Sequence, residues 1–286
     1  MTKLNSSDGF LSNIYDGVKK KTSKLFHSPY SKFNISWLNE KYFKHAVNGK
    51  EYVHAYSNDI KVKFTDPKAF LLSVSELFIN EIYKFNSANP SPYILDCGAH
   101  IGMSILYFKT LYPQAKIIAF EPDEHNYNLL KDNTSNWNFE NVVLVNKAIW
   151  VENGEVLFNE ANDMSSNIVE KTSTVEGKVK RIPSVRLKDY LIEKVDFLKI
   201  DIEGAEYSVL KDIEDSLSNV ELMFLEYHGN FEQNNELVEI FEILQKNGFS
   251  FYIKEEGNIY DQPFYEAKQN LKKKYDIQLN IFCFRQ

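Results

Sequence analysis

The chain has 286 residues, a length that suits one large domain or a domain with an added segment. Hydrophobic residues are 43% and charged residues 26% of the total, values that exclude a wholly disordered or collagen-like chain. The two cysteines, Cys97 and Cys283, are too few for a disulfide scaffold, and we expect both to be buried free thiols. No run approaches the ~18 apolar residues of a membrane helix and no signal peptide is visible, so we expect a soluble, cytoplasmic protein.

Charge is distributed unevenly along the chain. The net charge is -7, which argues against a general nucleic-acid binder. Residues 1–90 hold 13 Lys and 8 Asp or Glu, a balance of +5, so the remainder carries -12. A basic run, Lys19–Lys21 with Lys24, lies in the first part. It is either a solvated helix face or a docking surface for an anionic partner or membrane.

Residues 1–90 are expected to form an N-terminal α/β extension. Its first fifty residues have weak periodicity and predict short helices and loops, and residues 51–64 are β-prone. Asp66 and Pro67 are typical of a helix N-cap and first helical position, and the apolar spacing that follows predicts a helix over 67–85. A turn-rich linker, NSANPSP, then leads into a second domain, residues 91–286.

In the second domain, short apolar runs alternate with helical patterns. This alternation predicts an α/β fold with a mostly parallel sheet that is covered on both faces. The last two strands have no clear helix between them, so we expect them to form an antiparallel pair at the sheet edge. The expected strands are 93–97, 116–120, 142–145, 154–158, 195–200, 220–225, 249–253 and 280–284. The expected helices are 102–111, 123–133, 187–192, 205–213 and 236–246, and residues 159–180 read as a long mobile loop.

A glycine turn follows the first strand of this domain. Parallel sheets bind ligands beyond the carboxyl ends of their strands. In the segment DCGAHIG, residues 96–102, Gly98 allows a sharp turn, small Ala99 lets a ligand approach the backbone, and Gly102 permits close packing. The spacing is not that of a dinucleotide site, because His100 stands where the second glycine would be. A ligand without a pyrophosphate fits better, and S-adenosylmethionine is the leading candidate.

An acidic residue ends the next strand. Glu121 lies about 20 residues beyond the glycine turn, where a carboxylate can accept both ribose hydroxyls of an adenosine ligand. Pro122 then stops the strand. The alternative is an ordinary surface carboxylate before a turn, but the upstream glycines favour the ribose role.

The segment KIDIEGAE, residues 199–206, is the most specific string in the chain. It places three carboxylates at the end of one strand. Lys199 and Asp201 lie on the same face of that strand, and a lysine in a buried strand needs a partner such as a carboxylate. Glu206 falls in the first helical turn, where a negative charge suits the helix dipole.

The following strand ends in LEYHG, residues 225–229, with Glu226 and His228 on one face. Because consecutive strands are often neighbours, we expect Asp201, Glu203, Glu226 and His228 to converge at one edge. A histidine among carboxylates is a good candidate for a general base. Asp201, Glu226 and His228 could alternatively bind a divalent metal ion.

The segments DCGAHIG, FEP, KIDIEGAE and LEYHG resemble the FkbM family of S-adenosylmethionine-dependent methyltransferases, over residues 93–284. The resemblance implies a class I methyltransferase Rossmann-like fold, with a seven-stranded, mostly parallel sheet and an antiparallel last strand. It also implies O-methyl transfer, often to sugars or hydroxylated natural products. The family has Asn where this chain has His100, a change that adds bulk near the cofactor.

The resemblance also assigns roles to individual residues. The glycine turn would shape the methionine end of the cofactor site, Glu121 would hold the ribose, and the segment 146–149 would flank the adenine. Asp201 would lie at the border of cofactor and acceptor. The expected cofactor-binding residues are Asp96, Gly98, Ala99, His100, Gly102, Glu121, Pro122, Lys147, Ala148 and Asp201; the expected acceptor-binding residues are Glu203, Ser165, Ser166 and Asn167.

The predicted reaction is methyl transfer from S-adenosylmethionine to a hydroxyl of a small molecule or glycan. His228 or Asp201 would remove the hydroxyl proton, and Glu226 would orient His228. Three alternatives are a nicotinamide-dependent oxidoreductase, a nucleic-acid methyltransferase and a non-catalytic binding module. The glycine spacing argues against the first. The missing Asn/Asp-Pro-Pro-aromatic string and the acidic balance argue against the second, and intact site motifs argue against the third.

Overall fold

The computed structural model describes residues 28–160, 167–169, 178–257, 259–267 and 273–285. The chain forms two compact units, Met1–Ile82 and Tyr83–Gln286. We expected the second domain to begin at residue 91. It begins earlier because the Tyr83 ring packs on Phe108 and Phe224 of the second unit, with centroid distances of 5.8 and 4.7 Å.

The first unit is built around aromatic side chains. The rings of Phe64 and Phe70 stack 4.0 Å apart and are nearly parallel, at 7°. The Asp66 side chain caps the helix that begins at Pro67, as predicted. The predicted length of this helix, 67–85, is wrong: it passes into a π-helical turn, and Glu81 then has a φ of +52°. The elements are η1 (Pro29–Phe33), α2 (Trp37–His45), the hairpin strands β1 (Tyr52–Ala55) and β2 (Lys61–Phe64), α3 (Pro67–Val74) and η2 (Ser75–Ile79).

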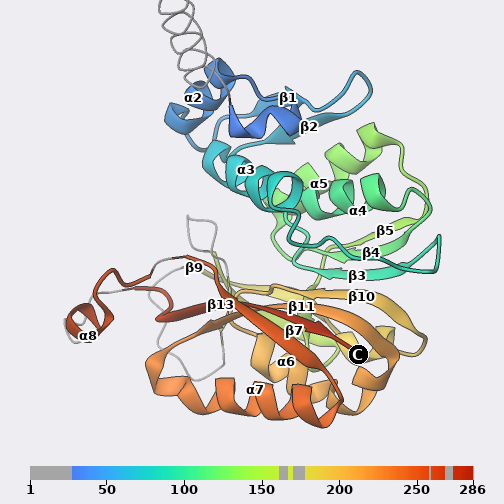
Figure 1. Ribbon diagram of the computed structural model, residues 1–286, viewed down its shortest axis with the longest axis vertical. Coiled ribbons are helices and arrows are strands. Elements are labelled where there is room, and N and C mark those ends of the chain that lie inside the picture. The colour runs from blue at the N-terminus through green and yellow to red at the C-terminus, as the bar shows by residue number, and fades with distance from the viewer. Residues whose placement is uncertain (1–27, 161–166, 170–177, 258, 268–272, 286) are drawn as a thin grey trace, which may run out of the picture. The chain divides into compact units, whose positions relative to one another are not determined.

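The second unit contains the predicted parallel sheet. Among the described residues it has seven strands in the order β12-β13-β11-β10-β3-β4-β5 (Figure 1). Only β13 runs antiparallel to its neighbours β11 and β12, so the predicted antiparallel last strand is confirmed. The strands are β3 (Tyr93–Cys97), β4 (Lys116–Phe120), β5 (Val142–Val145), β10 (Val195–Ile200), β11 (Val220–Gly229), β12 (Ser250–Glu255) and β13 (Ile277–Phe284).

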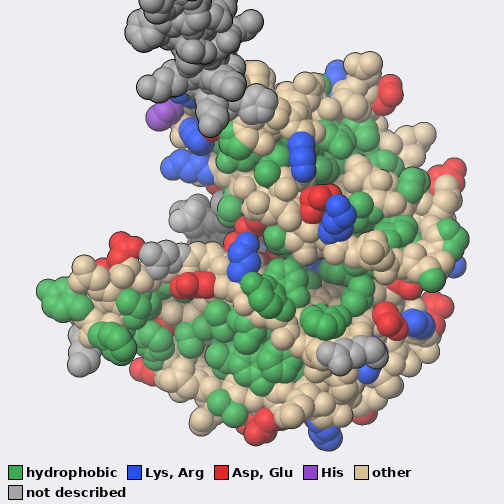
Figure 2. All heavy atoms as spheres, viewed as in Figure 1, with side chains coloured by type: hydrophobic (Ala, Val, Ile, Leu, Met, Phe, Trp, Pro, Cys, Tyr) green, Lys and Arg blue, Asp and Glu red, His purple; other side chains and the backbone are tan. Residues whose placement is uncertain are grey.

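Helices cover both faces of this sheet. Figure 1 shows α4 and α5 on one face and α6 and α7 on the other. Figure 2 shows hydrophobic side chains gathered where β12 and β13 lie, and Tyr252, Ile253 and Phe284 are partly exposed there. Cys97 and Cys283 are buried free thiols, as predicted. The helices are α4 (Met103–Leu111), α5 (Glu124–Trp137), α6 (Glu206–Asp212) and α7 (Asn234–Lys246), with short 3-10 turns η3 (Leu187–Tyr190), η4 (Glu214–Asn219) and η5 (Phe231–Gln233).

A second, smaller sheet corrects the predicted loop. Among the described residues it has four strands in the order β6-β9-β7-β8. The predicted loop 159–180 is wrong in part, because it contains β8 and the start of β9. The β9 strand forms because Ile182 packs on Val156 and Ala148 in a small apolar cluster. The strands are β6 (Ala148–Trp150), β7 (Gly154–Glu160), β8 (Asn167–Val169) and β9 (Lys178–Arg186).

Strand β11 is longer than predicted, which matters for the site. It continues to Gly229 because β13 pairs with it along its whole length, with His228 opposite Gln278 and Glu226 opposite Asn280. The segment between β12 and β13 carries only the short helix α8 (Pro263–Glu266) among its described residues. No helix in the described parts of the chain is long and apolar enough to span a bilayer.

Candidate functional site

The carboxyl ends of three adjacent strands bring the predicted carboxylates together. Strand β10 lies between β3 and β11, with Lys199 opposite Asp96 on one side and opposite Phe224 on the other. The ends of these strands carry Asp96, Asp201 and Glu226. We refer to this edge of the sheet as the carboxylate rim.

Lys199 is the buried cation of the rim. Its side chain is 4% exposed, and its Nζ lies 3.0 Å from Asp201 Oδ2 and 3.6 Å from Asp96 Oδ1. It also donates a hydrogen bond to the carbonyl of Gly98, at 2.7 Å. Burial alone would lower the pKa of Lys199, but the Asp201 and Asp96 carboxylates raise it above its ordinary value. The sequence prediction that this lysine needs a carboxylate partner is confirmed.

Asp96 lies inside the protein beneath the glycine turn. Its Oδ2 accepts a hydrogen bond from Ser104 Oγ at 2.5 Å, whereas its Oδ1 has no hydrogen-bond partner among the described residues. Burial raises the pKa of this carboxyl group, and Lys199 only partly offsets the effect. Asp96 is therefore a buried carboxyl group with a hydrogen-bond donor at only one of its two oxygens among the described residues.

The two glycines of the turn are required by packing. Gly98 has a φ of +93°, and a Cβ there would lie 1.9 Å from the backbone oxygen of Asp201. This close approach joins the tips of β3 and β10, with the Asp201 N–H bonded to the Cys97 carbonyl. A Cβ at Gly102 would lie 2.8 Å from Leu130 of α5, so this glycine packs on a neighbouring helix.

Glu121 lies against the glycine turn. Its two carboxylate oxygens accept hydrogen bonds from the N–H groups of His100 and Asp123, at 2.8 and 2.9 Å. Burial raises the pKa of Glu121 to about 8, although these two N–H groups lower it. Each carboxylate oxygen has a second lone pair, so the group retains capacity for two hydroxyl donors. The Asn146 amide bonds to the Glu121 carbonyl and so holds the end of β4 beside the end of β5.

The other expected cofactor residues are more varied in their surroundings. Ala99 is buried, with its N–H bonded to the carbonyl of Phe120, and Pro122 is half-buried. Lys147 is exposed, whereas Ala148 is buried in β6. Of the expected adenine-flanking segment 146–149, Asn146 and Lys147 are therefore the exposed residues, and Ala148 and Ile149 are buried.

Glu206 is a residue whose role the sequence did not reveal. Its side chain is 1% exposed, and its carboxylate accepts hydrogen bonds from the backbone N–H groups of Ile202 and Gly204. The same carboxylate lies 3.0 Å from His228 Nδ1. These bonds fix the loop in which Glu203 has a φ of +58°. Its place in the first helical turn was the available signal, which we interpreted as a helix-dipole effect.

His228 is buried between acidic and amide groups. Its side chain is 1% exposed, and its Nε2 lies 3.1 Å from the Gln278 amide nitrogen and 3.4 Å from Glu226 Oε1. Burial would lower the pKa of His228, but Glu206 and Glu226 raise it well above its ordinary value. Glu206 makes a shorter contact with the ring, at 3.0 Å, than Glu226 does, at 3.4 Å.

Glu226 is a largely buried carboxyl group among polar neighbours. Its side chain is 15% exposed and accepts a hydrogen bond from Gln278 at 3.0 Å. Burial and the Asp201 carboxylate raise its pKa to about 7, while His228 lowers it. A carboxyl group with such a pKa can both accept and donate a proton near neutral pH.

Two residues that precede β13 contact Glu203 beside the rim. Lys274 Nζ lies 2.9 Å from Glu203 Oε2, and the Tyr275 hydroxyl donates to the Glu203 carbonyl at 2.8 Å. The Tyr275 ring also lies 4.8 Å from the ring of His228. Sequence reasoning missed both residues because the pairing of β13 with β11 brings the segment before β13 here, and no local pattern specifies that pairing.

The expected metal-binding residues are only partly grouped. Asp201, Glu203 and His228 offer ligand atoms within 4.8 Å of one another, and Glu226 is not in this group. Lys199 and Lys274 already contact Asp201 and Glu203, so lysines supply positive charge where a metal ion was considered. Of the expected acceptor residues, Ser165 and Ser166 lie outside the described residues. Only the backbone of Asn167 is described; it lies in β8, opposite Asn159 of β7.

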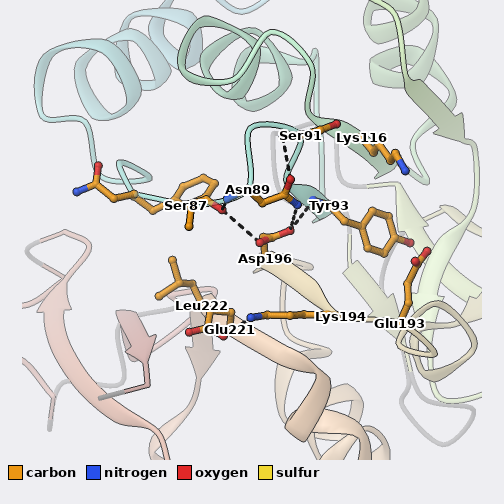
Figure 3. Close-up of a pocket in the computed structure, with 13 residues that line it drawn as sticks. Ser87, Asn89, Ser91, Tyr93, Lys116, Glu193, Lys194, Asp196, Glu221 and Leu222 are labelled. Carbon is orange, nitrogen blue, oxygen red and sulfur yellow. Dashed lines mark hydrogen bonds and ion pairs between the residues drawn. The ribbon is translucent and has the colours of Figure 1, made fainter.

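A cavity of about 460 Å³ lies at the opposite, amino end of the strands (Figure 3). There Asp196 accepts hydrogen bonds from Ser87 Oγ, Asn89 Nδ2 and the Tyr93 N–H. Lys194 pairs with Glu221 at 2.8 Å. Ligands of open α/β sheets bind at the carboxyl ends of strands, so this cavity is not the predicted cofactor site.

Comparisons with known proteins agree with the motifs. The family model described as Methyltransferase FkbM domain matches residues 96–251. Methyltransferase 1 of Beauveria bassiana is 26% identical over 191 residues, covering 57% of this chain and 77% of that protein. The 2-O-methyltransferase NoeI of Sinorhizobium fredii is 25% identical over 158 residues, covering 48% and 64%. The crystal structure of an FkbM methyltransferase from Methylobacillus flagellatus has 16% identity and a TM-score of 0.46, covering 69% of this chain and 45% of its own.

Proposed function

The chain belongs to the FkbM methyltransferase domain family, and from that premise we propose that it transfers a methyl group from S-adenosylmethionine to a hydroxyl group of a sugar, glycan or hydroxylated natural product. Family membership confirms the resemblance of the motifs and identifies the chain as a methyltransferase. The cofactor and the acceptor class are our proposal. The observation that carries it is the position of the buried Glu121 carboxylate against the glycine turn.

The residues at the carboxyl ends of the strands fit this cofactor. Glu121 would hold the ribose hydroxyls, the turn 96–102 would enclose the methionine end, and the segment 146–149 would border the adenine. Asp96 Oδ1 is a buried acceptor without a donor among the described residues, as expected beneath a polar ligand. The bound cofactor supplies the methyl group on a positively charged sulfur.

The protein's own task is to align the acceptor hydroxyl and to take its proton. We propose Glu226 for the proton, because its pKa of about 7 matches that task, whereas both ring nitrogens of His228 already lie within 3.1 Å of Glu206 and Gln278. Asp201, held by Lys199, would help to orient the acceptor, and Glu203 would bind it. This assignment moves the base from His228 or Asp201, the two residues that we expected from sequence, to Glu226.

The acceptor class is supported by the name of a relative and by the chemistry of the rim. NoeI is named as a 2-O-methyltransferase. Carboxylates and amides such as Glu226, Glu203 and Gln278 are suitable partners for hydroxyl groups. We expect activity without added metal, because Lys199 and Lys274 already neutralise part of the rim. An anionic surface contacting residues 1–90 is a further proposal; the basic run lies outside the described residues.

Calorimetric titration with S-adenosylhomocysteine tests the proposal. We expect micromolar binding to the wild-type chain, no binding of NAD, and at least tenfold weaker binding of S-adenosylhomocysteine to Glu121→Ala. Unchanged affinity in that variant would remove Glu121 from the site. Binding of NAD in place of S-adenosylhomocysteine would favour the oxidoreductase alternative.

A further inference from the structure

The charges of the carboxylate rim do not balance. Glu203 is paired with Lys274 at 2.9 Å, and Glu206 contacts the His228 ring at 3.0 Å and two backbone N–H groups. The remaining carboxylates are Asp96, Asp201 and Glu226, and Lys199 interacts electrostatically with all three. One lysine among three carboxylates leaves a surplus of negative charge when these groups are ionised.

The described part of the protein does not compensate this surplus. Asp96 is fully buried, and its Oδ1 lacks a hydrogen-bond donor. Asn280 lies directly opposite Glu226 in the sheet, is 1% exposed, and its Oδ1 also lacks a donor. Both atoms are acceptors that lack a hydrogen-bond donor, and the one cation near Asp96 Oδ1 among the described residues is Lys199, at 3.6 Å. Buried groups of this kind are costly unless a ligand supplies the missing charge.

The surroundings of the rim favour a cation that needs no coordination bonds. A metal ion at Asp201, Glu203 and His228 would compete with Lys199, Lys274 and Glu206 for the same atoms. A sulfonium group forms no coordination bonds. Nearby negative charges attract it through space, and the attraction weakens with distance. The rim can therefore keep its ion pairs and still attract such a cation.

We propose that the carboxylate rim distinguishes S-adenosylmethionine from S-adenosylhomocysteine by charge, with Asp201 and Glu226 as the residues that determine this selectivity. The inference rests on the proposed cofactor. The substrate carries a positive sulfur and the product a neutral one, so the rim attracts the substrate more strongly. Methyl transfer removes the charge and with it part of the affinity, which favours release of the product.

The test compares dissociation constants of the two ligands by calorimetry, without an acceptor. The wild-type chain should bind S-adenosylmethionine more tightly than S-adenosylhomocysteine. Asp201→Asn and Glu226→Gln should each reduce this preference by about tenfold or less, mainly by weakening S-adenosylmethionine, as expected for loss of one nearby charge at an intermediate dielectric constant. Two variants are used so that a folding defect in one does not decide the result.

Glu221→Gln is the matched control. Glu221 lies on the same strand as Glu226 but at its other end, and its ion pair with Lys194 is largely exposed. The substitution changes the net charge by the same amount, so the preference should remain at its wild-type value. A preference that falls equally in this control would mean that net charge, not the rim, sets the selectivity, and would overturn the inference.

Two further results would overturn it. Equal weakening of both ligands by Asp201→Asn and Glu226→Gln would show that these residues act by shape or hydrogen bonding alone. If the preference for S-adenosylmethionine appeared only with Mg²⁺ and vanished in EDTA, a bound metal ion, and not the carboxylates themselves, would determine the selectivity. Failure of the wild-type chain to bind either ligand is a different outcome, because it would overturn the proposed cofactor itself.

Discussion

The two ends of strand β10 carry the same pair of residue types in different surroundings. Lys194 and Asp196 lie at the amino end, and Lys199 and Asp201 at the carboxyl end. The Lys194 side chain is 66% exposed, whereas that of Lys199 is 4% exposed. At the amino end Lys194 pairs with Glu221 and Asp196 accepts three hydrogen bonds, whereas at the carboxyl end three carboxylates share one lysine. The candidate site therefore differs from an ordinary polar surface in two ways: its charged residues are buried, and its carboxylates outnumber its lysines.

The glycine that joins the strand tips should give the largest effect. Gly98→Ala would place a Cβ against the backbone oxygen of Asp201 at a positive φ, so we expect a loss of about 4 kcal/mol or more in the free energy of unfolding. Gly248 also has a positive φ, but its nearest neighbour, Arg285, is at an ordinary 3.5 Å. Gly248→Ala should therefore lose only about 1 kcal/mol. Urea unfolding measures both, and equal losses would contradict the packing role of Gly98.

Replacing the two lysines of β10 tests the comparison directly. Lys199→Met would leave Asp96 buried without its cation, so we expect a loss of about 3 kcal/mol in the free energy of unfolding. Lys194→Met removes a solvent-exposed ion pair and should give no measurable change. Urea unfolding of the two variants provides the measurement. A stable Lys199→Met variant would mean that Asp96 is protonated and needs no cation.

The pH dependence of stability should report the burial of Glu121. Its pKa is about 8 in the folded protein and near 4.5 in the unfolded chain, so the folded state binds more protons between these values. The contribution of this group to stability is therefore full below about pH 4.5 and decreases as the pH rises towards 8. The slope is on the order of 1 kcal/mol per pH unit.

The Glu121→Gln variant isolates this effect, because a glutamine does not titrate. Its free energy of unfolding, minus that of the wild-type chain, should increase as the pH is raised from 5 to 8, because only the wild-type chain loses stability. Chemical denaturation at four pH values across this range would measure the difference. A difference that does not change with pH would mean that Glu121 remains ionised throughout.

Local sequence patterns were sufficient to predict several strands of the second unit and one helix start of the first. The apolar runs of β3, β4, β5 and β10 and the Asp66-Pro67 helix start have strong short-range signals, and the structure has each of them. The helix expected over 67–85 is shorter, because Tyr83 packs into the second unit instead of continuing the helix. Strands β8 and β9 were missed because polar side chains obscured their alternation.

The predicted site was incomplete for a similar reason. Lys199, Asp201 and Glu226 follow from strand ends that neighbour one another, a rule that needs only chain order. Gln278, Lys274 and Tyr275 reach the site through antiparallel pairing of β13 with β11, which no local pattern specifies. Glu206 appeared to be a helix-dipole residue because its bonds to the loop and to His228 depend on tertiary structure.

Hydrogen–deuterium exchange with and without S-adenosylmethionine would test the central claim most directly, because it reads both ends of the strands in one experiment. We predict slower exchange for backbone amides in residues 96–102, 121–123 and 201–206, at the carboxyl ends. Exchange in residues 86–93 and 193–196, at the amino end, should not change. Protection confined to the amino end, or protection at neither end at saturating ligand, would contradict a cofactor site at the carboxylate rim.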